Sequence, residues 1–171
     1  MADSAIRDEY RDLQRRRTEP WIRRAFILLL FAIAVVALAG LFGQETKHTT
    51  VQSPAASMTL SSPTKVRGGL YFQTKITVVA RQNLAAPKIV LNDGFFDGLT
   101  LNTSEPQPSQ EINRNGRIAF DYDTLNAGQQ LTLWLQYQVN PVTVGGRTQR
   151  VELDDGNTPV ATIARDFRSF P

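Results

Sequence analysis

Residues Ala25–Gly43 form an unbroken, uncharged apolar run, AFILLLFAIAVVALAGLFG. A bilayer core is crossed by about 20 apolar residues in helical form. Only helices and closed barrels satisfy their backbone hydrogen bonds inside lipid. The run therefore predicts one transmembrane helix over residues 25–43, between an Arg-rich head (1–24) and a polar part of 128 residues.

The charges beside the run predict its orientation. Five arginines precede it closely: Arg15, Arg16, Arg17, Arg23 and Arg24. The segment that follows, Gln44–Lys47, has no net charge. Because basic residues near a span stay in the cytoplasm, we expect a single-pass protein of the cell membrane with a cytoplasmic N-terminus and an extracytoplasmic main domain.

A cleaved signal peptide is the competing interpretation. Ala37, Leu38 and Ala39 form an A-x-A triplet of the kind that leader peptidases cut. However, 24 residues including five acids precede the run, and the apolar stretch continues past the triplet. A signal peptide has a short basic start and an apolar region of about 7–15 residues, so we expect an uncleaved anchor.

Small residues recur along the predicted span at spacings of seven and four: Ala25, Ala32, Ala39 and Gly43. Such a stripe lets helices approach closely in lipid and suggests a homo-oligomer formed through the helix. Alanine is common in any such helix, so the alternative is a stripe without a packing role.

The charge balance bears on partner classes. The chain has 19 Lys and Arg against 16 Asp and Glu, and seven of the arginines and five of the acids lie in the head. A nearly neutral outer domain argues against a nucleic-acid partner. Cysteine is absent, which excludes disulfides and thiolate metal sites.

Beyond the span, residues 44–63 are rich in Ser, Thr, Gln and Pro and are expected to form a polar stalk, with a short strand near Met58–Ser61. From residue 64 to 171 apolar and polar residues alternate with period two, as in Leu131–Val139. Turn dipeptides such as Asn115-Gly116 and Gly145-Gly146 separate these runs. Six to eight such strands predict an all-β fold, an antiparallel sandwich over 64–171.

Two stretches carry a family resemblance: the strand Tyr71–Arg81, and the turn and strand of Leu125–Leu133, LNAGQQLTL. Together with the strand order over Met58–Pro171, they resemble immunoglobulin-like domains that occur as conserved repeats in bacterial envelope proteins. The resemblance implies an immunoglobulin-like sandwich located in the envelope. It implies no activity, because such sandwiches host unrelated functions.

The sequence offers few residues of the kinds that catalysis or metal binding requires. His48 is the only histidine, and a stalk is a poor place for a catalytic histidine, which must be held in a packed pocket. Asp93, Asp97, Asp121, Asp123, Asp154 and Asp155 lie in or beside predicted turns. They would suit calcium if the loops converged, but turns select Asp for their own geometry. We therefore expect no enzyme, no metal and no cofactor.

Trp134 is the strongest candidate for binding. If Leu133 and Leu135 face the core, Trp134 faces outward beside Gln136, where an aromatic ring can anchor a protein or stack on a sugar. The alternative is a ring covered by a neighbouring strand. Phe96, in a Gly-flanked turn, is a further partner-binding candidate.

These features predict a membrane-anchored module that tethers or positions a protein partner of the membrane or envelope, because an anchor raises the effective concentration for a neighbour. The alternative is a glycan-binding or cell-wall-binding module that uses Trp134.

Overall fold

The computed structural model describes residues 19–38 and 44–171. The chain divides into two compact units, residues 1–43 and 44–171, and each is described by itself.

The first unit contains helix α2, Glu19–Leu38. Pro20 lies in its first turn, where the missing N–H costs nothing, and Leu, Ala and Phe dominate the rest. The stretch Pro20–Leu38 has a mean hydropathy of 2.2, so by length and composition this helix can cross a membrane. Such an N-terminal helix is either an anchor or a signal sequence.

The helix differs from the predicted span at its start. It begins six residues before Ala25, so Arg23 and Arg24 lie within its first turns rather than before it. The predicted span had followed the apolar composition, whereas helical structure continues through polar residues. Of the predicted small-residue stripe, Ala25 and Ala32 lie on α2, while Ala39 and Gly43 lie outside the described residues, as do Arg15, Arg16 and Arg17.

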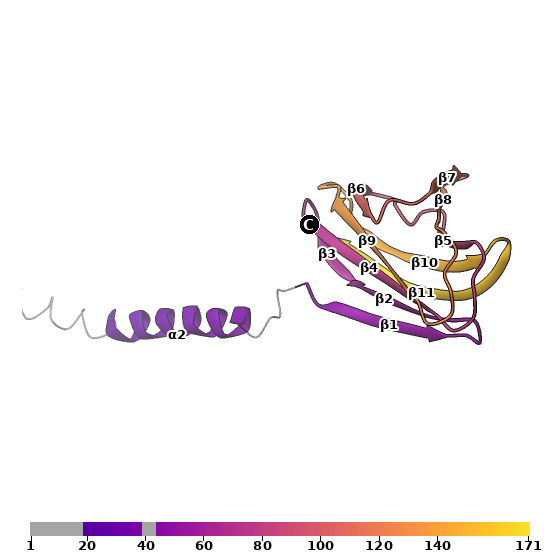
Figure 1. Cartoon of the computed structure of the whole chain (residues 1–171). Helices are drawn as coiled ribbons and strands as arrows, with labels where there is room; N and C mark the ends of the chain where they lie inside the picture. The colour runs from indigo at the N-terminus through magenta and orange to yellow at the C-terminus, as the bar shows by residue number, and fades with distance from the viewer. Residues whose placement is uncertain (1–18, 39–43) are drawn as a thin grey trace, which may run out of the picture. The chain divides into compact units, whose positions relative to one another are not determined.

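The second unit is an all-β sandwich of two sheets, which confirms the predicted fold class (Figure 1). One sheet has five strands, in the order β1 (Thr46–Gln52), β2 (Ala56–Pro63), β4 (Tyr71–Ala80), β9 (Gln130–Val139) and β6 (Leu99–Glu105). The other has six, in the order β3 (Lys65–Arg67), β11 (Thr158–Phe170), β10 (Gly145–Asp155), β5 (Pro87–Leu91), β8 (Arg117–Asp121) and β7 (Gln110–Arg114). Among the described strands, only β3 and β11 pair in parallel.

The core lies between the two sheets and is filled from alternate positions of the strands. On β9 the side chains of Leu133, Leu135 and Tyr137 are fully buried. On β10 and β11 the inward residues include Val151 and Phe167. Because the strand period is two, the residues between these positions face outward, so burial of the apolar set places the polar set on the surface.

The expected stalk over residues 44–63 is wrong. Residues 44–171 form one unit, and β1 and β2 are regular strands of the five-stranded sheet. Ala56, Met58 and Leu60 are fully buried on β2 and belong to the core. The inward side chains alternate with Ser and Thr, which suit the outer face of a strand. This polar composition also resembles that of a linker, so it predicts a stalk where the chain forms strands.

The hairpin turns follow their sequence signals more closely. Asn115 and Gly116 both adopt positive φ angles, 53° and 76°, and join β7 to β8 as a type I′ Asn-Gly turn would. The number of strands differs from the prediction, because the described residues contain eleven strands rather than six to eight. The additional ones include β6 and β7, whose polar sequences bury few side chains and so lack a clear alternation.

A polar network also lies between the sheets. The guanidinium of Arg165, on β11, donates from Nη2 to Ser62 Oγ at 2.9 Å and to Gln149 Oε1 at 2.8 Å. Ser62 lies on β2 and its hydroxyl is 2.7 Å from that of Thr74 on β4, so the network joins the two sheets. Burial lowers the pKa of Arg165 from its ordinary value to about 10.

Candidate binding surface around Trp134

The outer face of the five-stranded sheet carries Trp134 at a position that strand register determines. On β9, Leu133 and Leu135 are buried, so the intervening Trp134 faces outward with 38% of its surface exposed. Its antiparallel neighbours are Lys75 on β4 and Glu105 on β6. The predicted outward orientation of Trp134 therefore agrees with the structure, and the ring lies between one basic and one acidic side chain.

Lys75 contacts the indole directly. Its Nζ lies 4.9 Å from the centroid of the Trp134 ring. An ammonium over an indole face is held by the ring quadrupole and, at exposed sites, contributes about 0.5–1 kcal/mol. This contact restrains the indole while leaving more than a third of the residue open to solvent.

Two shallow hollows adjoin Trp134. One has a volume of about 280 Å³ and is lined by Gln73, Thr103, Glu105, Trp134 and Gln136. The other has a volume of about 380 Å³ and is lined by Gln44, Thr46, His48, Ser61, Pro63, Gln73, Lys75 and Trp134. We call these residues together the Trp134 surface. Trp134 and Gln73 line both hollows, so the indole lies between them.

The lining is rich in hydrogen-bonding groups. Amides, hydroxyls, one carboxylate, one ammonium and one imidazole surround a single large ring. A partner can therefore combine apolar contact with the indole and several directional hydrogen bonds, which is the composition of many interface centres. The predicted partner residue Gln136 belongs to this set.

Phe96, the other predicted partner-binding residue, does not belong to the Trp134 surface. Its ring is partly buried and lies 5.6 Å from the centroid of Tyr137 and 5.2 Å from that of Phe95. Tyr137 is an inward side chain of β9, so Phe96 packs on the opposite side of that strand from Trp134. The adjacent pair of phenylalanines gave no sign of which ring would stay exposed, and in the structure both contribute to the core.

His48 is in a strand rather than in a stalk. It lies on β1, opposite Ser61 of β2, and its Nδ1 is 2.7 Å from Ser61 Oγ. No described carboxylate forms an ion pair with His48. The pair is exposed on the sheet face, where it contributes polar groups to the Trp134 surface.

The acidic turns do not converge. Within residues 19–38 and 44–171, no three His, Asp or Glu side chains are grouped as a metal site requires. Asp121 lies 3.5 Å from the ammonium of Lys88, and Asp155 Oδ1 accepts a hydrogen bond from the Ala86 N–H at 2.7 Å. These carboxylates therefore have structural contacts within the turns and strands that carry them.

Sequence reasoning missed most of the Trp134 surface. Alternation along β4 could have placed Gln73 and Lys75 outward, but pairing them with Trp134 requires the register between β4 and β9. Thr103 and Glu105 lie on β6, beyond a register shift between Leu101 and Thr103. Such a shift moves side chains from one face to the other, so their place on this face follows only from the structure.

No protein-family model and no curated protein sequence matches the chain. Among solved structures, the chain is similar to the CARDB domain of the PF1109 protein from Pyrococcus furiosus, an immunoglobulin-like domain that was solved in complex with di-metal ions. The two share 12% identity over 72% of this chain and 95% of that chain, with a TM-score of 0.47. It is also similar to BslA, a bacterial hydrophobin, at 18% identity over 71% and 99% of the two chains, with a TM-score of 0.41. A third is the GAE domain of GGA2p from Saccharomyces cerevisiae, at 12% identity over 73% and 98%, with a TM-score of 0.39. These similarities are too remote to indicate a ligand or an activity.

Proposed function

We propose that this protein is a membrane-anchored extracytoplasmic interaction module that binds and positions a protein partner of the membrane or envelope through the Trp134 surface. The observation that supports it most is the exposed indole of Trp134 between two hollows on an otherwise polar sheet face. Tryptophan is the side chain most enriched among residues that dominate binding energy. Helix α2 would be the anchor and would confine this surface to one membrane.

The anchor makes weak binding sufficient. Confinement of two proteins to one membrane raises the effective concentration of each for the other. A shallow surface that combines one aromatic ring with polar groups suits such a partner. Binding should depend strongly on the central residue, because contacts at the rim of a shallow surface remain hydrated and contribute little.

The first test is a pull-down of the full-length protein, cross-linked in its native membrane, with mass spectrometry of the eluate. We expect one stoichiometric membrane or envelope protein. Trp134→Ala should reduce its recovery by about 30-fold, which corresponds to a loss of about 2 kcal/mol at a dominant residue. Trp134→Phe should retain part of the binding, since it keeps an aromatic ring.

Thr132→Ala is the matched control, because Thr132 lies on the same strand but outside both hollows. This variant should recover the partner as the parent does. Equal recovery with Trp134→Ala, or an eluate that contains only the protein itself, would contradict the proposal.

A glycan or cell-wall polymer is the second candidate, favoured by the amide, hydroxyl and carboxylate groups around the indole. Sugars bind proteins through such combinations of a ring face and polar groups. The chain has two tryptophans, so Trp21→Phe leaves Trp134 as the only indole fluorophore. Saturable quenching by cell-wall fragments in this variant, together with a clean pull-down eluate, would favour the glycan over the protein partner.

A further inference from the structure

Most of the exposed large apolar side chains of the sandwich are gathered at one end. Within residues 44–171 these are Leu70 (45% exposed), Tyr71 (66%), Val142 (90%), Val144 (61%) and Phe170 (44%), besides Trp134. We call these five the apolar end. An aqueous surface rarely concentrates such residues without a partner.

Three chain segments build the apolar end, and they touch. The β3–β4 turn meets the last residues of the chain, because Gly68 N–H donates to the Phe170 carbonyl at 2.7 Å. It also meets β9, because Gly69 N–H donates to the Val139 carbonyl at 2.9 Å. A Cβ on Gly68 would lie 2.9 Å from the Pro141 carbonyl oxygen, so glycine permits this close approach. The segments that carry the five side chains therefore lie next to one another.

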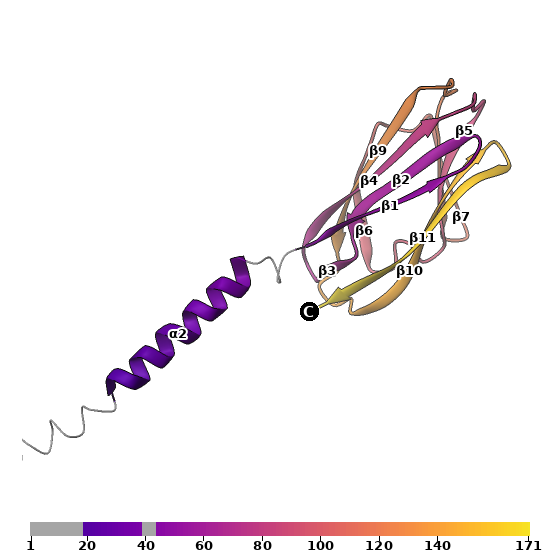
Figure 2. The same ribbon diagram turned by 90° about the horizontal axis from the view of Figure 1, so that it is seen from below.

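This is also the end at which the chain enters the sandwich. Thr46, the first residue of β1, pairs with Pro63, the last of β2, and β3 with its partner β11 ends nearby. Figure 2 shows the start of β1, strand β3 and the C-terminus at the same end of the sandwich. Only six residue steps separate Leu38 of α2 from Gln44, a stretch that reaches about 20 Å when fully extended.

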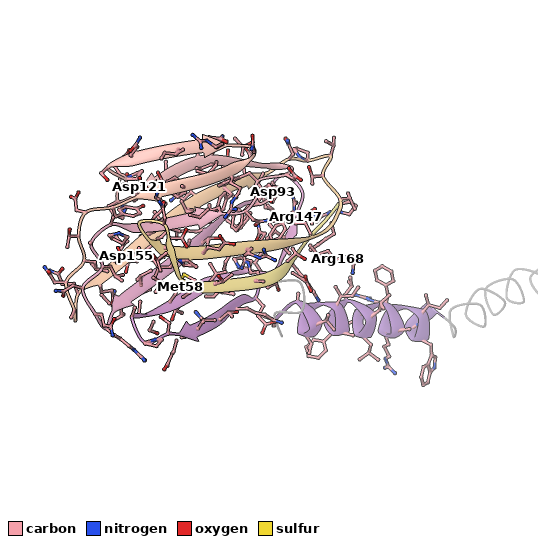
Figure 3. The ribbon with its side chains drawn as sticks, turned by 90° about the vertical axis from the view of Figure 1, so that its right-hand side faces the viewer. Met58, Asp93, Asp121, Arg147, Asp155 and Arg168 are labelled. Carbon is pink, nitrogen blue, oxygen red and sulfur yellow. The ribbon has the colours of Figure 1, made fainter. Side chains whose placement is uncertain are left out.

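Basic side chains surround the apolar end. Lys65, Arg67 and Arg168 are exposed on paired positions of β3 and β11, and none of them is in an ion pair with a described acidic residue. In Figure 3, Arg147 and Arg168 lie toward this end and Asp155 toward the other. Acidic residues lie there too: Asp93 is toward the same end in Figure 3, and Asp166 is two positions before Arg168 on β11.

We infer that the apolar end of the sandwich rests in the headgroup layer of the membrane in which the chain is anchored. Exposed Val and Leu with Tyr and Phe suit the boundary between headgroups and acyl chains. Nearby Lys and Arg attract anionic lipid. An anchor at α2 would keep the domain within reach of such a surface. This inference rests on the anchor role of α2 within the proposed function.

Docking would also orient the Trp134 surface. Tyr71 lies on β4 two residues before Gln73, on the same outer face. With the apolar end on the membrane, the hollow that Gln44 and Thr46 line would lie beside the bilayer. A partner in the same membrane could then reach Trp134 from the side.

The test uses site-specific fluorophores, because the chain has no cysteine to compete for the label. Val142→Cys places a probe on the apolar end, and Asn157→Cys places one in the β10–β11 turn at the opposite end. Both full-length proteins are labelled with NBD and reconstituted into phosphatidylcholine vesicles that contain about one third phosphatidylglycerol. We expect a blue-shifted emission and quenching by nitroxide lipids at 142, about twofold or more above that at 157.

Two charge-reversing substitutions test whether the basic residues beside the apolar end attract it to lipid. Lys65→Glu should lower the quenching at 142, whereas Arg81→Glu, the same change beside the far end of β1, should not. Equal quenching at 142 and 157 would overturn the docking inference, even if α2 proves to be an anchor. Because no partner protein is present, the result is independent of the pull-down, and carbonate extraction of the same vesicles tests the anchor separately.

Discussion

Arg165 shows how a single residue can connect the two sheets at an energetic cost. Its guanidinium lies in the interior and its hydrogen-bond partners are the neutral side chains of Ser62 and Gln149. The described residues offer it no ion-pair partner. Desolvation is the main cause of its pKa being lowered to about 10. The buried charge therefore opposes folding below pH 10, although the hydrogen bonds partly offset it.

We expect Arg165→Met to change the free energy of unfolding by less than about 2 kcal/mol, because removal of a desolvated charge offsets the loss of the donor to Ser62 and Gln149. Gln149→Ala should instead lower it by about 1–3 kcal/mol, since Arg165 and the Phe95 carbonyl then lose a partner. Urea denaturation of both variants measures this. A loss above about 2 kcal/mol in Arg165→Met would show that the guanidinium is a net stabiliser.

At the scale of elements, β1 and β2 differ most from what their sequence suggested. On β2, serine and threonine fill the outward positions, and Met58 fills an inward one with no exposed surface. Figure 3 marks Met58 within the sandwich. A stalk and a core strand make opposite predictions for this residue, because only a core position leaves a cavity when the side chain is truncated.

Met58→Ala should lower the free energy of unfolding by about 2–5 kcal/mol, the usual range for such a truncation in a core. Thr59→Ala, one residue along the strand on the outer face, should change it by less than about 1 kcal/mol. Thermal or urea unfolding of the two variants provides the comparison. Equal stabilities would mean that β2 does not belong to the folded unit.

For the molecule as a whole, the proposed function requires the residues before α2 and the sandwich to lie on opposite sides of the membrane. Single cysteines at Ser4 and Asn157 test this in intact cells with a membrane-impermeant maleimide. We expect labelling at 157 and none at 4 until the cells are lysed, because the arginines before the apolar run hold the N-terminus inside. The mass of the labelled protein also reports whether the chain is cut after Ala39: a cut would remove the anchor.

Features that depend on local composition and period follow from the amino-acid sequence alone. An uncharged apolar run makes a helix with no need for a partner, and alternation with Asn-Gly turns makes antiparallel strands and hairpins, because backbone geometry sets both periods. The outward direction of Trp134 followed from two buried neighbours on its own strand. The same local reasoning predicts a stalk from a polar stretch with prolines, and this prediction is wrong.

Which residues meet depends on the packing of strands that are distant in the sequence. Strand order places β4 and β6 beside the strand of Trp134, β1 and β2 line the same hollow, and a register shift determines which face Glu105 occupies. The apolar end combines residues about a hundred positions apart, from Leu70 to Phe170. Such contacts depend on pairing energies between strands distant in the chain, which no local period encodes. The fold class, Trp134 and Gln136 could therefore be predicted from the sequence, whereas the residues of other strands that surround them could not.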